Sequence, residues 1–299
     1  MRLEGLHHVT AITADAPANL DFYTRILGLR MVKKTVNFDS PDVYHLYYGD
    51  DTGTPGSILT FFEFPNAARG TAGDGMIHRV VWRLASEEAL AFWEARLRAE
   101  RVPELHADNE LYFSDHEGLA HELVVVASED APLVARADDI PPALAIQGLH
   151  AVRAFSRAPA ASAGILEALR FASEGADAWR VAGEARHALY HYDAAPVERG
   201  IPGAGTVHHV AWSAADDAEL EAFRHRVSSA GARPTPIIDR QYFHSVYFRE
   251  PSGVLFELAS RDVGFAVDEP VESLGEALKL PSQHEHLRAQ LEQTLTPLT

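Results

Sequence analysis

Two segments decide the fold of this chain: V-H-H-V-A-W at residues 207–212 and V-Y-F-R-E-P-S-G-V-L-F-E-L at residues 246–258. The first predicts a strand with a histidine pair, and the second predicts two strands joined by a turn at residues 250–253. Glu257 stands in an otherwise apolar strand, where a carboxylate is costly unless it has a partner. A histidine and a carboxylate on neighbouring strands supply two of the three ligands of a facial metal site.

The order of elements around these segments recurs along the chain. The first copy starts with a predicted strand at residues 5–13, and Asp15 and Pro17 predict the start of the helix that follows. Three more strands are predicted at residues 31–38, 43–49 and 57–64. The same βαβββ order starts again at residues 76, 147 and 207.

Four such modules predict an α+β fold in which mixed sheets form half-open barrels. A stretch rich in Pro, Asp and Ala at residues 128–145 predicts a linker. The modules therefore divide into a first pair at residues 1–127 and a second pair at residues 146–262.

The tail at residues 263–299 is predicted to contain a C-terminal helix. Leu287, Leu291 and Leu295 follow i, i+4 spacing, and S-Q-H-E at residues 282–285 matches a capping box. We expect this helix to pack on a domain, and the alternative is a lid over a site.

The composition excludes several classes of protein. The 299 residues carry a formal net charge of -17, which argues against nucleic-acid or anionic-membrane partners. The absence of cysteine excludes disulfides, thiolate metal sites and cysteine nucleophiles. No run of 18 apolar residues and no apolar leader is present, so we expect a cytoplasmic protein.

Histidines occupy repeated positions in the four opening strands. One position holds histidine in every copy, as His7, His78, His150 and His208. The next position holds His8 and His209 in the first and fourth copies, but Arg79 and Ala151 in the others. Adjacent strand residues face opposite sides of a sheet, so the two positions cannot share a role. We interpret the invariant position as structural, or at most as one whose side chain contacts a ligand residue, and the variable one as the position of a metal ligand.

The carboxylates sort in the same way. Glu122 and Glu257 each lie four residues after a turn glycine, and Glu257 can be combined with His8 and His209. Glu122 belongs with Arg79 and Ala151, which supply no ligand. The sequence therefore predicts one metal site and one site that has lost its ligands, with modules one and four meeting. The alternative is that the two histidines are hydrogen-bonded core residues.

The predicted ligand set narrows the chemistry. Two imidazoles and one carboxylate on one face leave three coordination positions open, which is the ligand set of non-haem Fe(II) oxygen chemistry, although Mn(II) would also fit. Glu63 is a further carboxylate in a predicted strand, but its distance from Gly56 does not match the other copies, so we do not assign it as a fourth ligand.

With these features the sequence resembles the vicinal oxygen chelate superfamily, which includes glyoxalase I, fosfomycin-resistance proteins and extradiol ring-cleaving dioxygenases. The pattern Y-x-x-E-P-x-G-x-x-x-E at residues 247–257 is similar to the tail of the type I extradiol signature. In catechol-cleaving members a histidine precedes this tail, whereas Arg240 stands in that region here. His244 is too close to the tail to match it and stays unassigned.

This departure looks like the subfamily that cleaves hydroquinones. The resemblance implies Fe(II), a small aromatic substrate and O2, and a homo-oligomer is also compatible with it. It implies His8, His209 and Glu257 as metal ligands and Arg240 and Tyr247 as groups that act on the substrate. Weaker matches place further side chains around the ligands, namely His7, Thr10 and His208. Two alternatives stay open: a glyoxalase-type metal-dependent isomerase or lyase, and a metal-free ligand-binding protein of the bleomycin-resistance kind.

Overall fold

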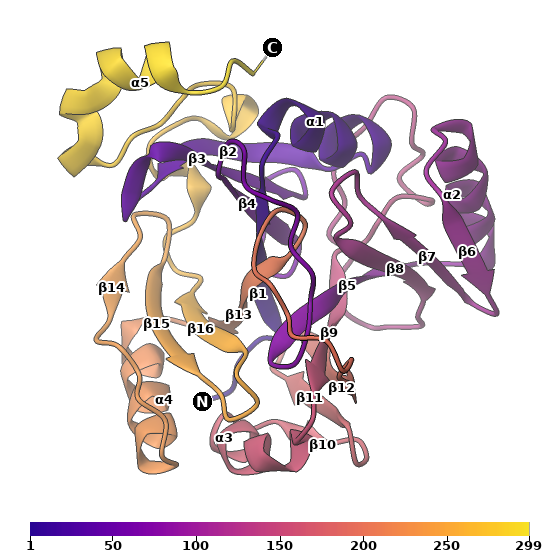
Figure 1. The fold of residues 1–299 in the computed structure, drawn as a ribbon, viewed down its shortest axis with the longest axis vertical. Coiled ribbons are helices and arrows are strands. Elements are labelled where there is room, and N and C mark those ends of the chain that lie inside the picture. Colours follow the sequence, from indigo (N-terminus) through magenta and orange to yellow (C-terminus); the bar gives the residue numbers. More distant parts are fainter. Residues whose placement is uncertain (299) are drawn as a thin grey trace.

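Two eight-stranded mixed sheets form the molecule (Figure 1). The computed structural model describes residues 1–298. It contains the four modules expected from the sequence, each with a strand, a helix and three further strands, and it confirms the α+β fold.

The first two modules supply the N-terminal half of the elements. The first consists of β1 (Leu6–Thr13), α1 (Ala16–Asp21), η1 (Phe22–Ile26), β2 (Arg30–Asn37), β3 (Ser40–Gly49) and β4 (Ile58–Glu63). The second consists of β5 (Met76–Leu84), α2 (Glu87–Ala99), β6 (Glu104–Ala107), β7 (Glu110–Ser114) and β8 (Ala120–Val125).

The other two modules repeat this order. The third consists of β9 (Leu149–Ser156), η2 (Pro159–Ser162), α3 (Ala163–Ala168), β10 (Ala172–Ser173), β11 (Ala178–Ala182) and β12 (His187–Ala194). The fourth consists of β13 (Val207–Ala214), α4 (Asp217–Ser229), β14 (Ile238–Asp239), β15 (His244–Arg249) and β16 (Leu255–Ser260).

The sheets pair modules that are not neighbours in sequence. The first sheet has the order β14-β15-β16-β13-β1-β4-β3-β2, so it joins modules four and one and curls into a half-barrel (Figure 1). The second has the order β10-β11-β12-β9-β5-β8-β7-β6 and joins modules three and two. The first and last quarters of the chain therefore meet at the antiparallel β1–β13 pair, as the predicted ligand positions require. The division into domains at residues 128–145 stays a prediction.

Apolar helix faces hold the sheets in place. Helix α2 buries Leu90, Trp93 and Leu97, and the stripe of α4 is equally buried at Leu220, Phe223 and Val227. Both helices begin at side chains that accept a hydrogen bond from the first turn, because unpaired backbone amides there need a partner. These acceptors are Ser86 and Asp216.

The histidine shared by all four modules is a bulged residue. In the β1–β13 ladder, Leu6 and His8 pair with consecutive residues of β13, which leaves His7 without a partner, and His208 is the extra residue on β13. The β5–β9 ladder repeats this at His78 and His150. A bulge interrupts the alternation of side chains and re-aims its neighbours. The invariant position is therefore structural, but the expectation that its side chain faces away from the next histidine is wrong.

The tail contains the expected helix but not the expected cap. It comprises η3 (Phe265–Val267), η4 (Val271–Ser273), η5 (Ser282–Leu287) and α5 (Arg288–Thr294), and it lies beside β2 and β3 (Figure 1). The capping box is wrong, because Ser282 begins a 3-10 turn without a side-chain cap and Glu285 pairs with Arg288 instead. Leu291 and Leu295 are buried as predicted. None of the helices within residues 1–298 is both long and apolar enough to cross a membrane.

A buried ion pair fastens this tail to the first sheet. The ammonium group of Lys33 in β2 is fully buried and lies 2.7 Å from Asp268 and 2.5 Å from Glu269. Replacing Lys33 by Met should destabilise the protein by about 3 kcal/mol, because Glu269 is left buried without its counter-charge. Urea denaturation followed by circular dichroism measures this loss. The matched variant Lys34→Met should change stability by less than about 0.5 kcal/mol, and a similar loss in both variants would contradict the assignment.

Candidate metal centre

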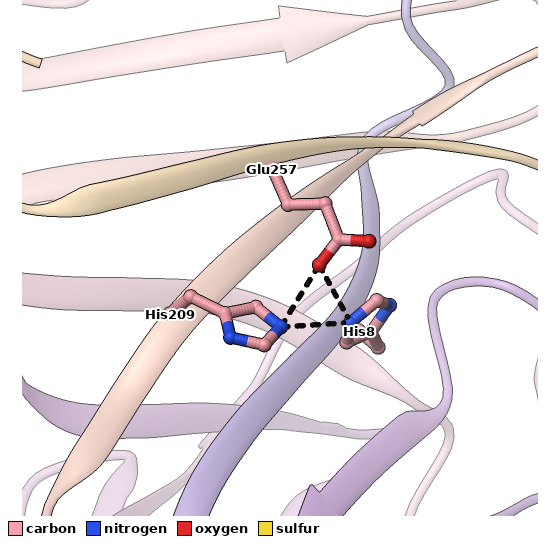
Figure 2. Close-up of side chains that lie close together, drawn as sticks. All are labelled: His8, His209 and Glu257. Atoms are coloured by element: carbon pink, nitrogen blue, oxygen red, sulfur yellow. Dashed lines mark hydrogen bonds and ion pairs between the residues drawn. The ribbon is translucent and has the colours of Figure 1, made fainter. Parts of the chain in front are cut away.

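Three side chains from three strands converge inside the curled sheet (Figure 2). His8 lies on β1, His209 on β13 and Glu257 on β16. The two Nε2 atoms are 3.2 Å apart, and Oε2 of Glu257 lies 2.9 Å from Nε2 of His209 and 3.3 Å from Nε2 of His8. All three side chains are buried, and together they form a group that could hold a metal ion.

The spacing of these three atoms fits a metal ion. Ligands about 2.1 Å from one ion and at right angles to each other lie about 3 Å apart, close to the observed separations. Oε2 of Glu257 is buried and has no well-directed hydrogen bond among the described residues, despite its short distance to His209. A buried acceptor without a donor is costly, and a bound cation would satisfy it. The residues present therefore fit a divalent metal ion.

The protonation states also suit a metal ligand set. Burial alone would raise the pKa of Glu257, but the imidazoles of His8 and His209 hold this pKa well below its usual range. Burial lowers the pKa of His209, which keeps its imidazole neutral. An ionised carboxylate and a neutral imidazole are the forms that coordinate metals.

The bulged histidines orient the two imidazoles at the centre. Nδ1 of His7 lies 2.9 Å from Nδ1 of His8, and Nε2 of His7 lies 3.2 Å from the carbonyl oxygen of Ser260. Burial lowers the pKa of His7 to about 3, so its ring is neutral. Since the carbonyl only accepts, His7 donates from Nε2 and accepts at Nδ1 from His8. The free lone pair of His8 is then on Nε2, the atom that faces the centre.

The fourth module repeats this contact. Nδ1 of His208 lies 2.8 Å from Nδ1 of His209. Contacts of this kind fix the ring orientation of metal-bound histidines. The structure thus places the side chains of His7 and His208 against those of His8 and His209.

Arg240 and Tyr247 line the same cavity as the three converging residues. This cavity has a volume of about 420 Å³. Nε of Arg240 donates to the Tyr247 hydroxyl at 3.3 Å, and Nη1 of Arg240 lies 3.0 Å from Asp39. Burial raises the pKa of Tyr247, so its hydroxyl stays protonated. A permanent cation and a hydroxyl donor therefore face the space next to the candidate metal position.

The structure places three other predicted or considered residues away from this cavity. Thr10 lies behind the wall, where its hydroxyl is 2.8 Å from that of Thr60. His244 pairs with Asp217 at 2.6 Å on the outer side of β15. Glu63 is buried and accepts from the Ala16 amide. None of the three is among the residues that line the cavity.

Sequence reasoning missed the wall formed by β3. His45 and Tyr47 line the cavity together with Phe62 and Phe243. Successive side chains of β3 point alternately to the two faces of the sheet. Both faces carry large side chains, among them Tyr44 and Tyr48. Its pattern therefore does not tell the cavity face from the core face.

In the second sheet, the positions that correspond to His8 and His209 hold Arg79 and Ala151. Arg79 occupies the position of His8, and its Nη1 lies 3.3 Å from Oε2 of Glu122. Its guanidinium also lies over the Tyr112 ring at 4.6 Å. The Arg79 guanidinium therefore supplies a positive charge next to the buried carboxylate of Glu122. Ala151, at the position of His209, has no atom that could bind a metal. Among residues 1–298, the group of His8, His209 and Glu257 is the single candidate of this kind.

Comparison with known proteins agrees with this architecture. The chain is 40% identical over 302 residues to the Bacillus subtilis protein named "Putative ring-cleaving dioxygenase MhqO", covering 98% of this chain and 96% of the relative. It is 33% identical to the "Chlorohydroquinone/hydroquinone 1,2-dioxygenase" of Sphingobium indicum, covering 98% of this chain and 96% of that protein.

Solved structures extend the likeness to three dimensions. The crystal structure of a Bacillus subtilis protein described as a "putative dioxygenase" matches with a TM-score of 0.91 and 38% identity, covering 100% of this chain and 98% of that one. Glyoxalase I from Zea mays matches with a TM-score of 0.61 and 13% identity, covering 86% and 92%, which shows a shared fold alone. The family model matches residues 5–123 and 170–258. The chain therefore belongs to the Glyoxalase/Bleomycin resistance protein/Dioxygenase superfamily.

Proposed function

We propose that this protein is a non-haem Fe(II)-dependent dioxygenase that opens the ring of hydroquinone-type aromatics with O2. One observation carries the proposal: His8, His209 and Glu257 converge at the wall of a cavity that is large enough for a substituted benzene ring. The relatives named "Putative ring-cleaving dioxygenase MhqO" and "Chlorohydroquinone/hydroquinone 1,2-dioxygenase" support the same class of reaction.

The ligand set determines what a bound metal would contribute. Fe(II) held by His8, His209 and Glu257 would act as a Lewis acid toward a ring hydroxyl and would mediate charge transfer between the ring and O2. Mn(II) suits the same three ligands.

The protein side chains supply the rest of the site. Aromatic and aliphatic residues of the cavity hold the ring and exclude water, including Phe62, Phe243 and Leu255. Arg240 stays cationic and stabilises negative charge that develops on oxygen during the reaction. Tyr247, whose hydroxyl stays protonated, donates to a substrate oxygen.

The preference for para-diols over catechols rests on Arg240. Catechol-cleaving members of the family resembled here carry a histidine before the signature tail, and this chain has Arg240 on the cavity wall instead. A guanidinium only donates hydrogen bonds and cannot accept a proton from substrate. The relative named for chlorohydroquinone and hydroquinone supports this substrate class.

The isomerase alternative is less compatible with the site. Enzymes that resemble glyoxalase I use more carboxylate ligands, and Glu63, the additional carboxylate considered, accepts from Ala16 and Thr296 away from the cavity. A metal-free binding protein gives no reason for two imidazole nitrogens and Oε2 of Glu257 to lie within 3.3 Å of one another at the cavity wall.

Oxygen consumption by Fe(II)-loaded protein tests the proposal. Hydroquinone, methylhydroquinone and chlorohydroquinone should be consumed with O2 at least about tenfold more efficiently than catechol. Faster turnover of catechol would contradict the substrate class. Absence of O2 uptake by metal-loaded protein would contradict the dioxygenase, and failure to retain any added Fe(II) would favour the metal-free binder.

A further inference from the structure

A line of hydrogen-bonded side chains runs along the wall of the cavity that β1, β4 and β3 form. The Thr10 hydroxyl lies 2.8 Å from that of Thr60, which lies 2.9 Å from Nε2 of His45. Nδ1 of His45 lies 2.9 Å from the Tyr47 hydroxyl. These residues come from β1, β4 and β3, and all four are buried. His45 and Tyr47 line the cavity, whereas the two threonines lie behind it.

The hydrogen bonds of this line can run in either direction. Burial holds the pKa of His45 well below its usual range, so its neutral ring has one donor and one acceptor nitrogen. In one arrangement Tyr47 donates to His45, and the Tyr47 oxygen can accept from a molecule in the cavity. In the other, His45 donates to Tyr47, and the Tyr47 hydrogen is free to donate into the cavity. The hydroxyl of Tyr47 can therefore meet either a donor or an acceptor.

The ring of Tyr47 is held in place on both sides. Its centroid lies 4.0 Å from that of His45 and 5.1 Å from that of Phe265 in the tail. A rigid aromatic side chain with a fixed hydroxyl loses little conformational entropy when it binds a ligand. The hydroxyl is consequently preorganised at the cavity wall.

A neutral ring hydroxyl is the group that this arrangement suits. Such a hydroxyl both donates and accepts, as the Tyr47 hydroxyl does, whereas the guanidinium of Arg240 only donates. The Tyr247 hydroxyl on the other half of the sheet already accepts from Arg240. The Tyr47 hydroxyl thus offers a bound substrate a second polar contact, on the side of the cavity that β3 forms.

We propose that Tyr47, positioned by His45, binds the ring hydroxyl of a para-diol that remains free when the other hydroxyl is at the candidate metal centre. This assignment rests on the proposed function and adds a residue that recognises the second hydroxyl of the substrate. Tyr47 touches the substrate, and His45 is a positioning residue. Phenol, which lacks the second hydroxyl, leaves Tyr47 without its partner.

Anaerobic titration calorimetry on the Fe(II)-loaded protein tests the role of Tyr47, because it measures the affinity for the aromatic ligand and does not depend on turnover. Wild-type protein should bind hydroquinone about tenfold more tightly than phenol, the effect of one well-placed hydrogen bond. Tyr47→Phe should bind phenol as the wild type does and should reduce the hydroquinone preference to less than about twofold. An unchanged preference in Tyr47→Phe would overturn the assignment, and so would equal affinity of the wild type for both ligands.

Tyr48 provides a matched control for the loss of a hydroxyl. It is the next residue of β3, it packs in the core, and its buried hydroxyl has no hydrogen-bond partner within residues 1–298. Tyr48→Phe should therefore retain the wild-type preference for hydroquinone. Loss of the preference in Tyr48→Phe as well would overturn the specific role of Tyr47.

Variants of His45 separate positioning from folding. His45→Gln keeps one donor and one acceptor and should retain part of the hydroquinone preference, whereas His45→Leu should abolish it while phenol still binds. Equal preference in the two variants would overturn the positioning role. O2 uptake by the wild type is measured on the same protein preparations. If O2 is consumed but Tyr47→Phe keeps the wild-type preference for hydroquinone over phenol, this inference alone is rejected. If no O2 is consumed, the proposed function is rejected.

Discussion

Replacement of His8 by alanine is expected to lower the affinity for Fe(II) by more than about 100-fold and to abolish O2 consumption with hydroquinone. Loss of an outer partner of a metal ligand already costs about 10- to 100-fold in affinity, and His8 supplies one of three ligand atoms itself. Isothermal titration with Fe(II) under anaerobic conditions measures the affinity. Circular dichroism establishes that the variant is folded.

His78→Ala is the matched control for this change. His78 stands at the equivalent bulge region of the second sheet, where its Nε2 lies 2.8 Å from Asp193. Its replacement should leave Fe(II) affinity within about twofold of the wild type, because His78 contacts Asp193 and is not one of the three residues of the candidate metal centre. Equal loss of metal in both variants would show that the effect comes from the fold and not from coordination.

Replacement of Arg240 by methionine is expected to lower turnover of hydroquinone by about 100- to 1000-fold, the effect of removing one group that stabilises developing negative charge. Fe(II) affinity should change little, because Arg240 contributes none of the three ligand atoms. Steady-state O2 consumption measures turnover, and anaerobic titration measures metal affinity.

Two further variants define the role of Arg240. Arg240→Lys keeps the charge but lacks the planar guanidinium, so it should recover part of the turnover. Arg233→Met removes an exposed arginine from the segment before β14 and should turn over as the wild type does. Turnover of Arg240→Met within about threefold of the wild type would contradict the role of charge stabilisation.

The repeated modules and the three residues of the candidate metal centre were predictable because they depend on local sequence. Glu257 lies in an apolar strand, and His8 and His209 occupy the same position in two copies of one module. Three such residues can converge only if modules one and four share a sheet, and the β1–β13 pair provides this contact. The buried carboxylate of Glu257, which is unfavourable without a partner, therefore indicated that modules one and four lie in the same sheet.

Features that depend on tertiary contacts were not predictable. Strict alternation fails at His7 and His208, because bulges are set by the pairing of strands far apart in sequence. The role of the β3 wall depends on the direction in which the sheet curls, which the two apolar faces of the strand do not reveal. The segment predicted as a capping box forms a 3-10 turn instead, and Nε2 of His284 in this turn lies 3.0 Å from the carbonyl oxygen of Phe38 in the first module.

The most direct measurement is anomalous X-ray diffraction at the iron edge from crystals grown anaerobically with Fe(II). The account predicts one peak per chain, at about 2.0–2.3 Å from Nε2 of His8, Nε2 of His209 and a carboxylate oxygen of Glu257. A peak at any other place, or none at a concentration of Fe(II) that supports O2 consumption, would contradict it.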